Sequence, residues 1–404
     1  MTAVHSVSEN IYMPKMQRQK RNSIFYLSEG SMAFLILLDI LFFPRILPFF
    51  GIPISLFLVF KHIFENGIGK TRFLMILITL LLTIISIFHS LFVKDHLYLI
   101  DDVKRILQLA TSLLYGAVFF NLNAKQYLSL TFLLRIFFAW LFLWALLFLV
   151  SPDSYKELGA FLYPEVLETL DVNINASRFN YFFADPNSAG YFICFAFCLY
   201  IALEKNIYFL MISSLIVTFL IGLTQSRGSF VGLLFIFLHY YFYSKNPRHR
   251  KILFLAIAGC LLILIYLQFK DTLNSLYQIY ELRSEVEEAS GVGFGGGRAD
   301  KYQYFFSNLN PSLWGVGYFL VVDGAEFRPH SDLIRINFSY GLPFLFVFSY
   351  FILPRVKAGF LIFFVFLIPF LINTVIDDYK LLPLYLLILN LIFTLNSQSK
   401  GRVL

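Results

Sequence analysis

Charged residues are scarce in this chain of 404 residues, making up 14% of it, whereas hydrophobic residues make up 58%. An ordinary soluble domain has about a quarter of charged residues, so a soluble protein is excluded. The three cysteines, Cys194, Cys198 and Cys260, all lie within apolar stretches, which argues against a disulfide framework or a zinc site. Internal repeats, low-complexity linkers and a cleavable signal peptide are also missing from the pattern.

Long apolar stretches and 50 phenylalanines take the place of these features. Stretches of about 17 to 25 apolar residues predict membrane-spanning helices. We therefore expect an all-α polytopic integral membrane protein with about twelve transmembrane helices in a single membrane domain, residues 1–404. The expected spans are two short helices within 32–60 that turn near Pro44 to Pro48, and then 73–93, 106–121, 128–150, 188–203, 206–222, 229–243, 252–268, 333–353, 358–374 and 381–396.

The basic residues behind the net charge of +7 are distributed unevenly among the connections between these spans. Basic residues recur in every second connection, namely Lys15, Arg18, Lys20, Arg21, Lys61, Lys70, Arg72, Lys125, Lys205, Lys245, Arg248, Arg250, Lys251, Arg355, Lys357, Lys400 and Arg402. Because cytoplasmic loops are enriched in Lys and Arg, both termini are predicted to be cytoplasmic. The two large loops, 151–187 and 269–332, then lie on the outer, periplasm-like face. We therefore interpret the basic residues as determinants of membrane orientation, and we expect no nucleic acid partner.

The end of the first large loop carries the first candidate site residue. Asp185, Pro186 and Asn187 are typical of a helix start, since Asp and Asn accept hydrogen bonds from free N–H groups and Pro suits the first turn. Arg178 comes just before this start and could contact a bound anion.

A very short outer turn, residues 223–232, contains Arg227. Such a cation could extend to the lipid headgroups or bind an anion. Ser226 and Ser229 flank it and Gly228 permits close approach, so we favour anion binding.

The second large loop contains a glycine-rich run that ends in Arg298. It mimics a dinucleotide-binding fingerprint, but no strand precedes it, so we interpret the glycines as a flexible segment that places Arg298. A guanidinium binds phosphate through two parallel hydrogen bonds and stays charged at any working pH. Asp300 either orients this guanidinium or is a solvated charge.

His330 and Ser331 stand where this loop enters a helix, and Arg335 follows one turn later. His330 is the one histidine expected outside the membrane among hydrogen-bond donors. It either caps the helix or acts as a general base near neutral pH.

The order of these motifs resembles the O-antigen ligase and polymerase (Wzy/WaaL) superfamily. The resemblance covers roughly residues 177–350 and rests on Ser226-Arg227-Gly228, Gly297-Arg298, Trp314-Gly315-Val316-Gly317, His330-Ser331 and Gly341. Phe344 departs from the family pattern, which often has Gly, Thr or Tyr at that position. Asp332 and Arg335 after the histidine look more like the repeat-unit polymerases.

The resemblance implies a GT-C-like inverting glycosyltransferase of the bacterial inner membrane, working on its periplasmic face without cofactor or metal. Its partners would be an undecaprenyl-pyrophosphate-linked glycan donor, a glycan acceptor and membrane lipid, with a chain-length regulator and a flippase as further partners. Arg227, Arg298 and Arg178 would bind the pyrophosphate. His330 would take the proton of the acceptor hydroxyl, supported by Ser331, Arg335 and Asp300.

Three functions stay open at this point. The first is an O-antigen or surface-polysaccharide polymerase, and the second is a ligase that transfers the glycan to lipid A-core or to protein. The third is a transporter or flippase, which should gather ionisable residues at mid-membrane. The candidates for that, Asp39, Arg135 and His239, do not cluster in the sequence.

Overall fold

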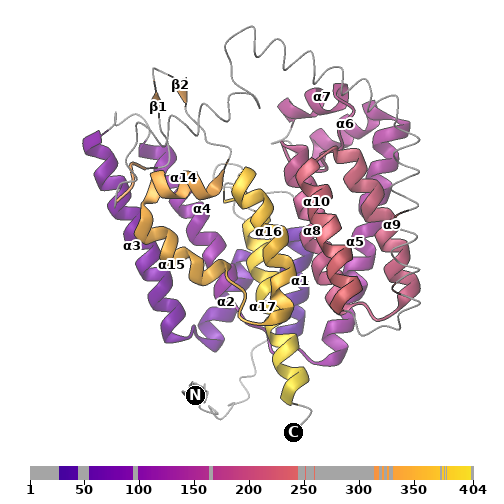
Figure 1. The fold of residues 1–404 in the computed structure, drawn as a ribbon, viewed down its shortest axis with the longest axis horizontal. Coiled ribbons are helices and arrows are strands. Elements are labelled where there is room, and N and C mark those ends of the chain that lie inside the picture. The colour runs from indigo at the N-terminus through magenta and orange to yellow at the C-terminus, as the bar shows by residue number, and fades with distance from the viewer. Residues whose placement is uncertain are drawn as a thin grey trace, which may run out of the picture.

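The computed structural model describes residues 27–43, 54–93, 99–162, 167–243, 251, 259, 314–317, 321–322, 325–326, 331–373, 375–376, 378 and 380–401. The predicted span 252–268 and most of the predicted loop 269–332 therefore lie outside the described residues. Within them the chain is almost entirely helical (Figure 1).

The described helices follow one another along most of the chain. They are α1 (Glu29–Phe42), α2 (Leu56–Asn66), α3 (Lys70–Val93), α4 (Leu99–Ala117), α5 (Ala124–Val150), α6 (Pro152–Leu162), α7 (Leu167–Asn175), α8 (Pro186–Leu203), α9 (Ile207–Thr224), α10 (Arg227–Tyr243), α14 (Asp332–Tyr340), α15 (Leu342–Ile352), the 3₁₀ turn η3 (Lys357–Gly359), α16 (Phe360–Ile372) and α17 (Leu381–Gly401). Two short antiparallel strands, β1 (Val321–Val322) and β2 (Ala325–Glu326), pair Val321 with Glu326.

Five of the described helices, α3, α5, α8, α9 and α17, are long and apolar enough to cross a membrane. A sixth span results if α15 and α16 are one span bent by 111°. The protein is therefore a multi-pass membrane protein, as the composition predicted. These five or six candidate spans are identified only by the length and composition of the described helices. The predicted count of twelve spans and their orientation therefore stay predictions.

One predicted span is wrong, and one predicted loop contains helices that the sequence pattern did not indicate. The predicted span 333–353 is broken into α14 and α15 at Gly341, whose φ is +85°, a value that residues with a side chain rarely adopt. Pro343 in the first turn of α15 marks the new start. The predicted loop 151–187 contains two helices, α6 and α7, which are too short and too polar to have been recognised as spans.

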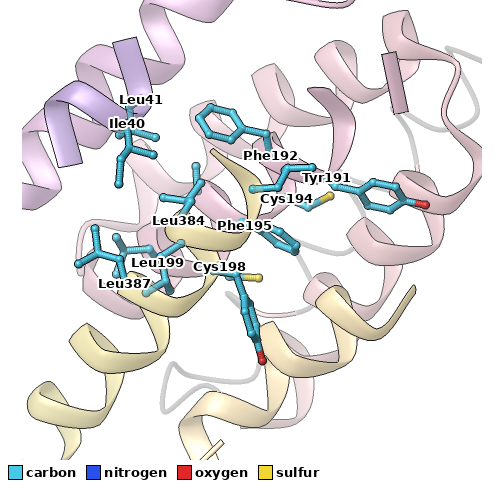
Figure 2. Packing of buried hydrophobic residues seen from close by; sticks show 14 of the residues in the cluster. Ile40, Leu41, Tyr191, Phe192, Cys194, Phe195, Cys198, Leu199, Leu384 and Leu387 are labelled. Atoms are coloured by element: carbon cyan, nitrogen blue, oxygen red, sulfur yellow. The ribbon is translucent and has the colours of Figure 1, made fainter. Parts of the chain in front are cut away.

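Helix α8 is the most buried of the candidate spans. It packs against α5, α9, α10, α16 and α17, and 83% of it is buried. Its residues are apolar or small on every side, as a helix surrounded by others requires. Figure 2 shows Phe192, Phe195 and Leu199 of α8 in one buried cluster that also includes Ile40 of α1 and Leu384 of α17. This packing fixes the position of the first turn of α8, where the candidate site begins.

The carboxyl end of α4 accepts hydrogen bonds from side chains of two other helices. Asn390 of α17 donates to the carbonyl oxygens of Gly116 and Val118, both at 2.9 Å, and Arg72 of α3 donates to that of Ala117 at 3.3 Å. These donors satisfy carbonyls that have no partner within the helix. The guanidinium carbons of Arg72 and Arg355 lie 3.3 and 6.0 Å from the ring centre of Phe119. Two basic residues predicted to be cytoplasmic thus share one end of the molecule.

Candidate active site

The turn between α9 and α10 is closed by its own side chains. Gln225 adopts the left-handed conformation with φ +53° and ends α9. The hydroxyl of Ser226 accepts a hydrogen bond from the Ser229 amide at 3.3 Å and lies 2.8 Å from the Ser229 hydroxyl. Ser226 therefore caps α10, and Arg227 is its first residue, with an exposed side chain. The turn is as short as the sequence predicted.

Arg178 is held against this same turn. Its Nε donates to the Thr224 carbonyl at 3.2 Å, and the neighbouring Phe179 amide donates to the Leu223 carbonyl at 2.9 Å. A second guanidinium nitrogen, Nη2, lies 3.4 Å from the side-chain oxygen of Asn187. Burial lowers the pKa of Arg178, and the Asp185 carboxylate opposes that shift. Since an arginine starts from so high a value, Arg178 keeps its charge at neutral pH.

The first turn of α8 lies next to Arg178. Asp185 caps this helix by accepting from the Asn187 amide at 3.0 Å, and Pro186 follows as the first helical residue. The prediction of a helix start at Asp185-Pro186-Asn187 is confirmed. The other carboxylate oxygen of Asp185 accepts from the side-chain nitrogen Nδ2 of Asn373, at the end of α16, at 3.4 Å.

Asn373 links the start of α8 to the start of α14. Its carbonyl accepts from the Asp332 amide at 3.1 Å. The Asp332 carboxylate, which is fully buried, accepts in turn from the amides of Val375 and Ile376, the latter at 3.1 Å. Ser331 caps α14 through its hydroxyl, 3.5 Å from the Ile334 amide. The predicted helix entrance at Ser331 is confirmed.

Helices α8 and α10 approach each other closely through two glycines. A side chain on Gly190 would meet Ser229, with 2.8 Å between the two Cβ atoms. A side chain on Gly228 would meet the Tyr191 ring, 2.9 Å from its Cζ atom. The absence of side chains at both positions brings the two helix starts together.

The amino-terminal end of α8 thus contacts that of α10 directly and is linked to that of α14 through Asn373. A helix start carries a partial positive charge and free N–H groups, and it favours anions. Arg178 and Arg227 add two full positive charges beside the first two of these starts. The arrangement is suited to bind an anion such as a phosphate.

The structure describes four of the seven predicted site residues, and the functional roles of all seven stay predictions. Arg178 is hydrogen-bonded to the α9–α10 turn, Arg227 is the first residue after that turn, and Ser331 caps α14. Arg335 is only 6% exposed and lies on α14. The catalytic candidate His330, and Arg298 and Asp300, lie outside the described residues, so their roles stay predictions.

Sequence reasoning missed Asn373 and the structural role of Asp332. Asn373 is far from both partners in the chain, 188 residues after Asp185, and no local pattern marks it. Asp332 was noted as a feature of the polymerases, but its carboxylate holds the connection between α16 and α17. His89 of α3, which was not among the predicted site residues, contacts the carbonyl oxygen of Gly315.

Cys194 and Cys198 are unpaired and buried in α8, as their apolar surroundings predicted. Within the described part of the chain, no three His, Cys, Asp or Glu residues are grouped so that they could hold a metal ion. The expectation of a metal-independent reaction stays a prediction.

Part of the chain matches a known protein family. Residues 212–349 match the family model described as Wzy_C, O-Antigen ligase. The chain contains a domain of the Wzy_C family. Enzymes of this family transfer lipid-linked glycans, as ligases or as polymerases. A search of curated proteins and a search of solved structures found no match.

The Wzy_C domain covers about a third of the chain and does not contain the whole site. It includes Arg227, the start of α14 and the predicted loop between them. Arg178 and Asp185 precede it, and Asn373 follows it. The site therefore joins the Wzy_C domain to helices from both flanking parts of the chain.

Proposed function

We propose that this protein is a polymerase of the bacterial inner membrane that joins oligosaccharide repeat units carried on undecaprenyl pyrophosphate. The observation that best supports this proposal is the hydrogen bond from Arg178 to the turn from which Arg227 begins α10. The two arginines are separated in the chain by the helices α8 and α9. Two charged groups gathered at helix starts suit a diphosphate.

In the proposed reaction the bond between the anomeric carbon of the donor glycan and the diphosphate oxygen breaks, and the diphosphate keeps the electron pair. The acceptor hydroxyl oxygen bonds to that carbon from the opposite face and inverts it. His330 takes the hydroxyl proton. Arg178, Arg227 and Arg298 stabilise the charge that grows on the diphosphate, the kind of contribution that is worth most when the donors are already in position.

A diphosphate leaving group needs no general acid, so one base is sufficient. The helix capping by Ser331 would hold the segment that His330 precedes. Arg335 on the same helix and Asp300 in the loop would support this arrangement. Each of these roles rests on the likeness to the family, together with the position of Ser331 at the start of α14.

The proposed periplasmic position of the site is supported by the charge distribution. Arg72 lies in the first turn of α3, whereas Ser86 and His89, near its other end, contact the Gly315–Gly317 segment next to α14. The basic cluster of Arg72 and Arg355 is therefore a helix length away from α14. Since basic loops are retained in the cytoplasm, the site end would face outward.

A ligase is the second candidate, because the matching family is described by that activity. Asp332 and Arg335, whose presence favoured a polymerase, are both buried. Their presence is therefore explained by packing around the site as well as by the polymerase reaction. The acceptor distinguishes the two. A chain-length regulator and a flippase would work beside a polymerase.

A transporter is disfavoured by what its candidate residues do. The carboxylate of Asp39 accepts from the Ser55 amide at 2.8 Å. Arg135 forms an ion pair with Glu204 at 2.7 Å, and Tyr200 and the Asn206 amide also donate to that carboxylate. These residues hold separate pairs of elements together instead of lining a common path.

The direct experiment is to incubate the purified protein with a synthetic undecaprenyl-pyrophosphate-linked repeat unit and to size the products. A polymerase yields a ladder of glycans that stay on the lipid carrier. A ligase yields longer glycan only on added lipid A-core. Movement of the donor across a vesicle membrane without a new glycosidic bond would overturn both.

A further inference from the structure

The segment Trp314–Gly317 is fixed between α3 and α14. The Val316 and Gly317 amides donate to the Phe338 and Ser339 carbonyls at 2.8 and 3.0 Å. From the other side, the Ser86 hydroxyl accepts from the Gly317 amide at 3.1 Å and donates to the Ser339 carbonyl. This segment is therefore attached to two helices at once.

His89 of α3 completes this attachment. Its Nδ1 lies 2.5 Å from the Gly315 carbonyl oxygen, which can only accept, so the ring donates. Gly315 has φ +71°, and a side chain there would lie 2.6 Å from the Tyr340 amide nitrogen. Only glycine fits this close approach, which explains the first glycine of the W-G-x-G motif.

Trp314 stands at the edge of this fixed segment with 45% of its surface exposed. It lies beside the carboxyl end of α14, whereas the candidate site lies at the amino end. Nine helical residues separate these ends, a length of about 13 Å. Figure 1 shows α14 lying across the end of the bundle, below β1 and β2. A short oligosaccharide that starts from the diphosphate could extend along α14 to Trp314.

We propose that Trp314 is a sugar-binding subsite for the glycan of the lipid-linked substrate, and that His89 and Ser86 are positioning residues for it. This inference rests on the proposed function. The indole offers a large flat apolar surface that suits the C–H face of a pyranose ring. Holding the adjacent backbone in place lets the ring bind without first being ordered, which lowers the cost of binding.

A tryptophan at the membrane interface is the other use of an exposed indole. Interfacial anchoring tolerates a mobile backbone and needs no histidine or serine from a neighbouring helix. The hydrogen bonds from α3 therefore favour the sugar subsite.

The test compares the KM for a full repeat-unit donor with the Ki of undecaprenyl pyrophosphate, which has the diphosphate and no sugar. Trp314→Ala should raise that KM about 3- to 10-fold, from a stacking contribution of about 1 kcal/mol, and leave the Ki unchanged. Trp314→Phe, which keeps a ring, should lie near wild type. Arg227→Ala should raise both the KM of the donor and the Ki of undecaprenyl pyrophosphate.

The positioning role of His89 is tested by a matched pair of variants. His89→Ala should raise the same KM, and His89→Asn, whose side-chain N–H takes the place of Nδ1 and can still donate to the Gly315 carbonyl, should restore it. An unchanged KM in Trp314→Ala, or an equal rise of KM and Ki, would overturn the subsite. A wild-type protein that transfers no glycan, although folded, would instead overturn the proposed function on which the subsite rests.

Discussion

At the scale of single residues, the charged groups of this protein have two different uses. Asp332, Arg135 and Arg72 are buried or half-buried and serve the fold, through backbone amides, an ion pair and a helix end. Arg227 is exposed at a helix start, and Arg178 combines hydrogen bonds to its neighbours with a position beside that start. Exposure at a joined set of helix starts, more than the presence of charge, marks the candidate site.

Asp332 gives a prediction about stability. Asp332→Ala leaves the Val375 and Ile376 amides buried without their acceptor, at about 1–3 kcal/mol each. Thermal unfolding in detergent should therefore begin at a clearly lower temperature. Asp332→Asn keeps an oxygen acceptor and should lose less.

Asp153→Asn, in the exposed first turn of α6, is the matched control and should unfold like wild type. If Asp332→Ala unfolds at the wild-type temperature, the carboxylate does not hold the connection between α16 and α17.

At the scale of elements, the site depends on how closely α8 and α10 pack. Gly190→Ala and Gly228→Ala each place a methyl group against Ser229 or Tyr191. Such overpacking costs about 1–3 kcal/mol and would push the two helix starts apart. Both variants should lose stability, and their transfer activity should fall further than their stability explains.

Gly232→Ala is the control on the same helix, because its nearest atom would be 3.4 Å away, an ordinary contact. It should be neutral or slightly stabilising, since alanine favours helix. Equal activity in all three glycine variants, measured on folded protein, would contradict the close packing of α8 and α10 as a requirement of the site.

The elements themselves were predictable to different degrees. Long apolar stretches predicted α3, α5, α8 and α9 to within a few residues, because a membrane span needs both length and hydropathy. Helices α6 and α7 were missed, since short polar helices leave no such pattern. The break at Gly341 was missed because an apolar stretch continues across it, and only the backbone conformation reveals it.

The sequence named the candidate site residues that the structure describes, but it did not indicate their geometry. Arg178 and Arg227 were each identified from their neighbours in the chain. Nothing in the sequence indicated that Arg178 would bond to Thr224, 46 residues away. Asn373, which joins α8 to α14, depends on packing between distant helices and has no local signal.

At the scale of the whole molecule, the account requires the site end to face away from the cytoplasm. Cysteines introduced at two exposed positions can test this in cells, in a background that carries Cys260→Ser. Glu157→Cys on α6 should react with a membrane-impermeant maleimide, whereas Lys357→Cys should react only after lysis. Cys194 and Cys198 are buried and should contribute little background. Reaction of Lys357→Cys in intact cells would reverse the proposed orientation.

The central claim is that Arg178 and Arg227 bind the diphosphate of a lipid-linked glycan at the joined starts of α8, α10 and α14. The most direct measurement is single-turnover transfer from a synthetic undecaprenyl-pyrophosphate-linked repeat unit by purified wild-type protein, Arg227→Ala and Arg178→Ala. The account predicts that Arg227→Ala lowers the rate by about 100- to 1,000-fold, the usual cost of losing one preorganised donor, and that Arg178→Ala also lowers it, while both proteins stay folded. Transfer by Arg227→Ala at the wild-type rate would contradict it.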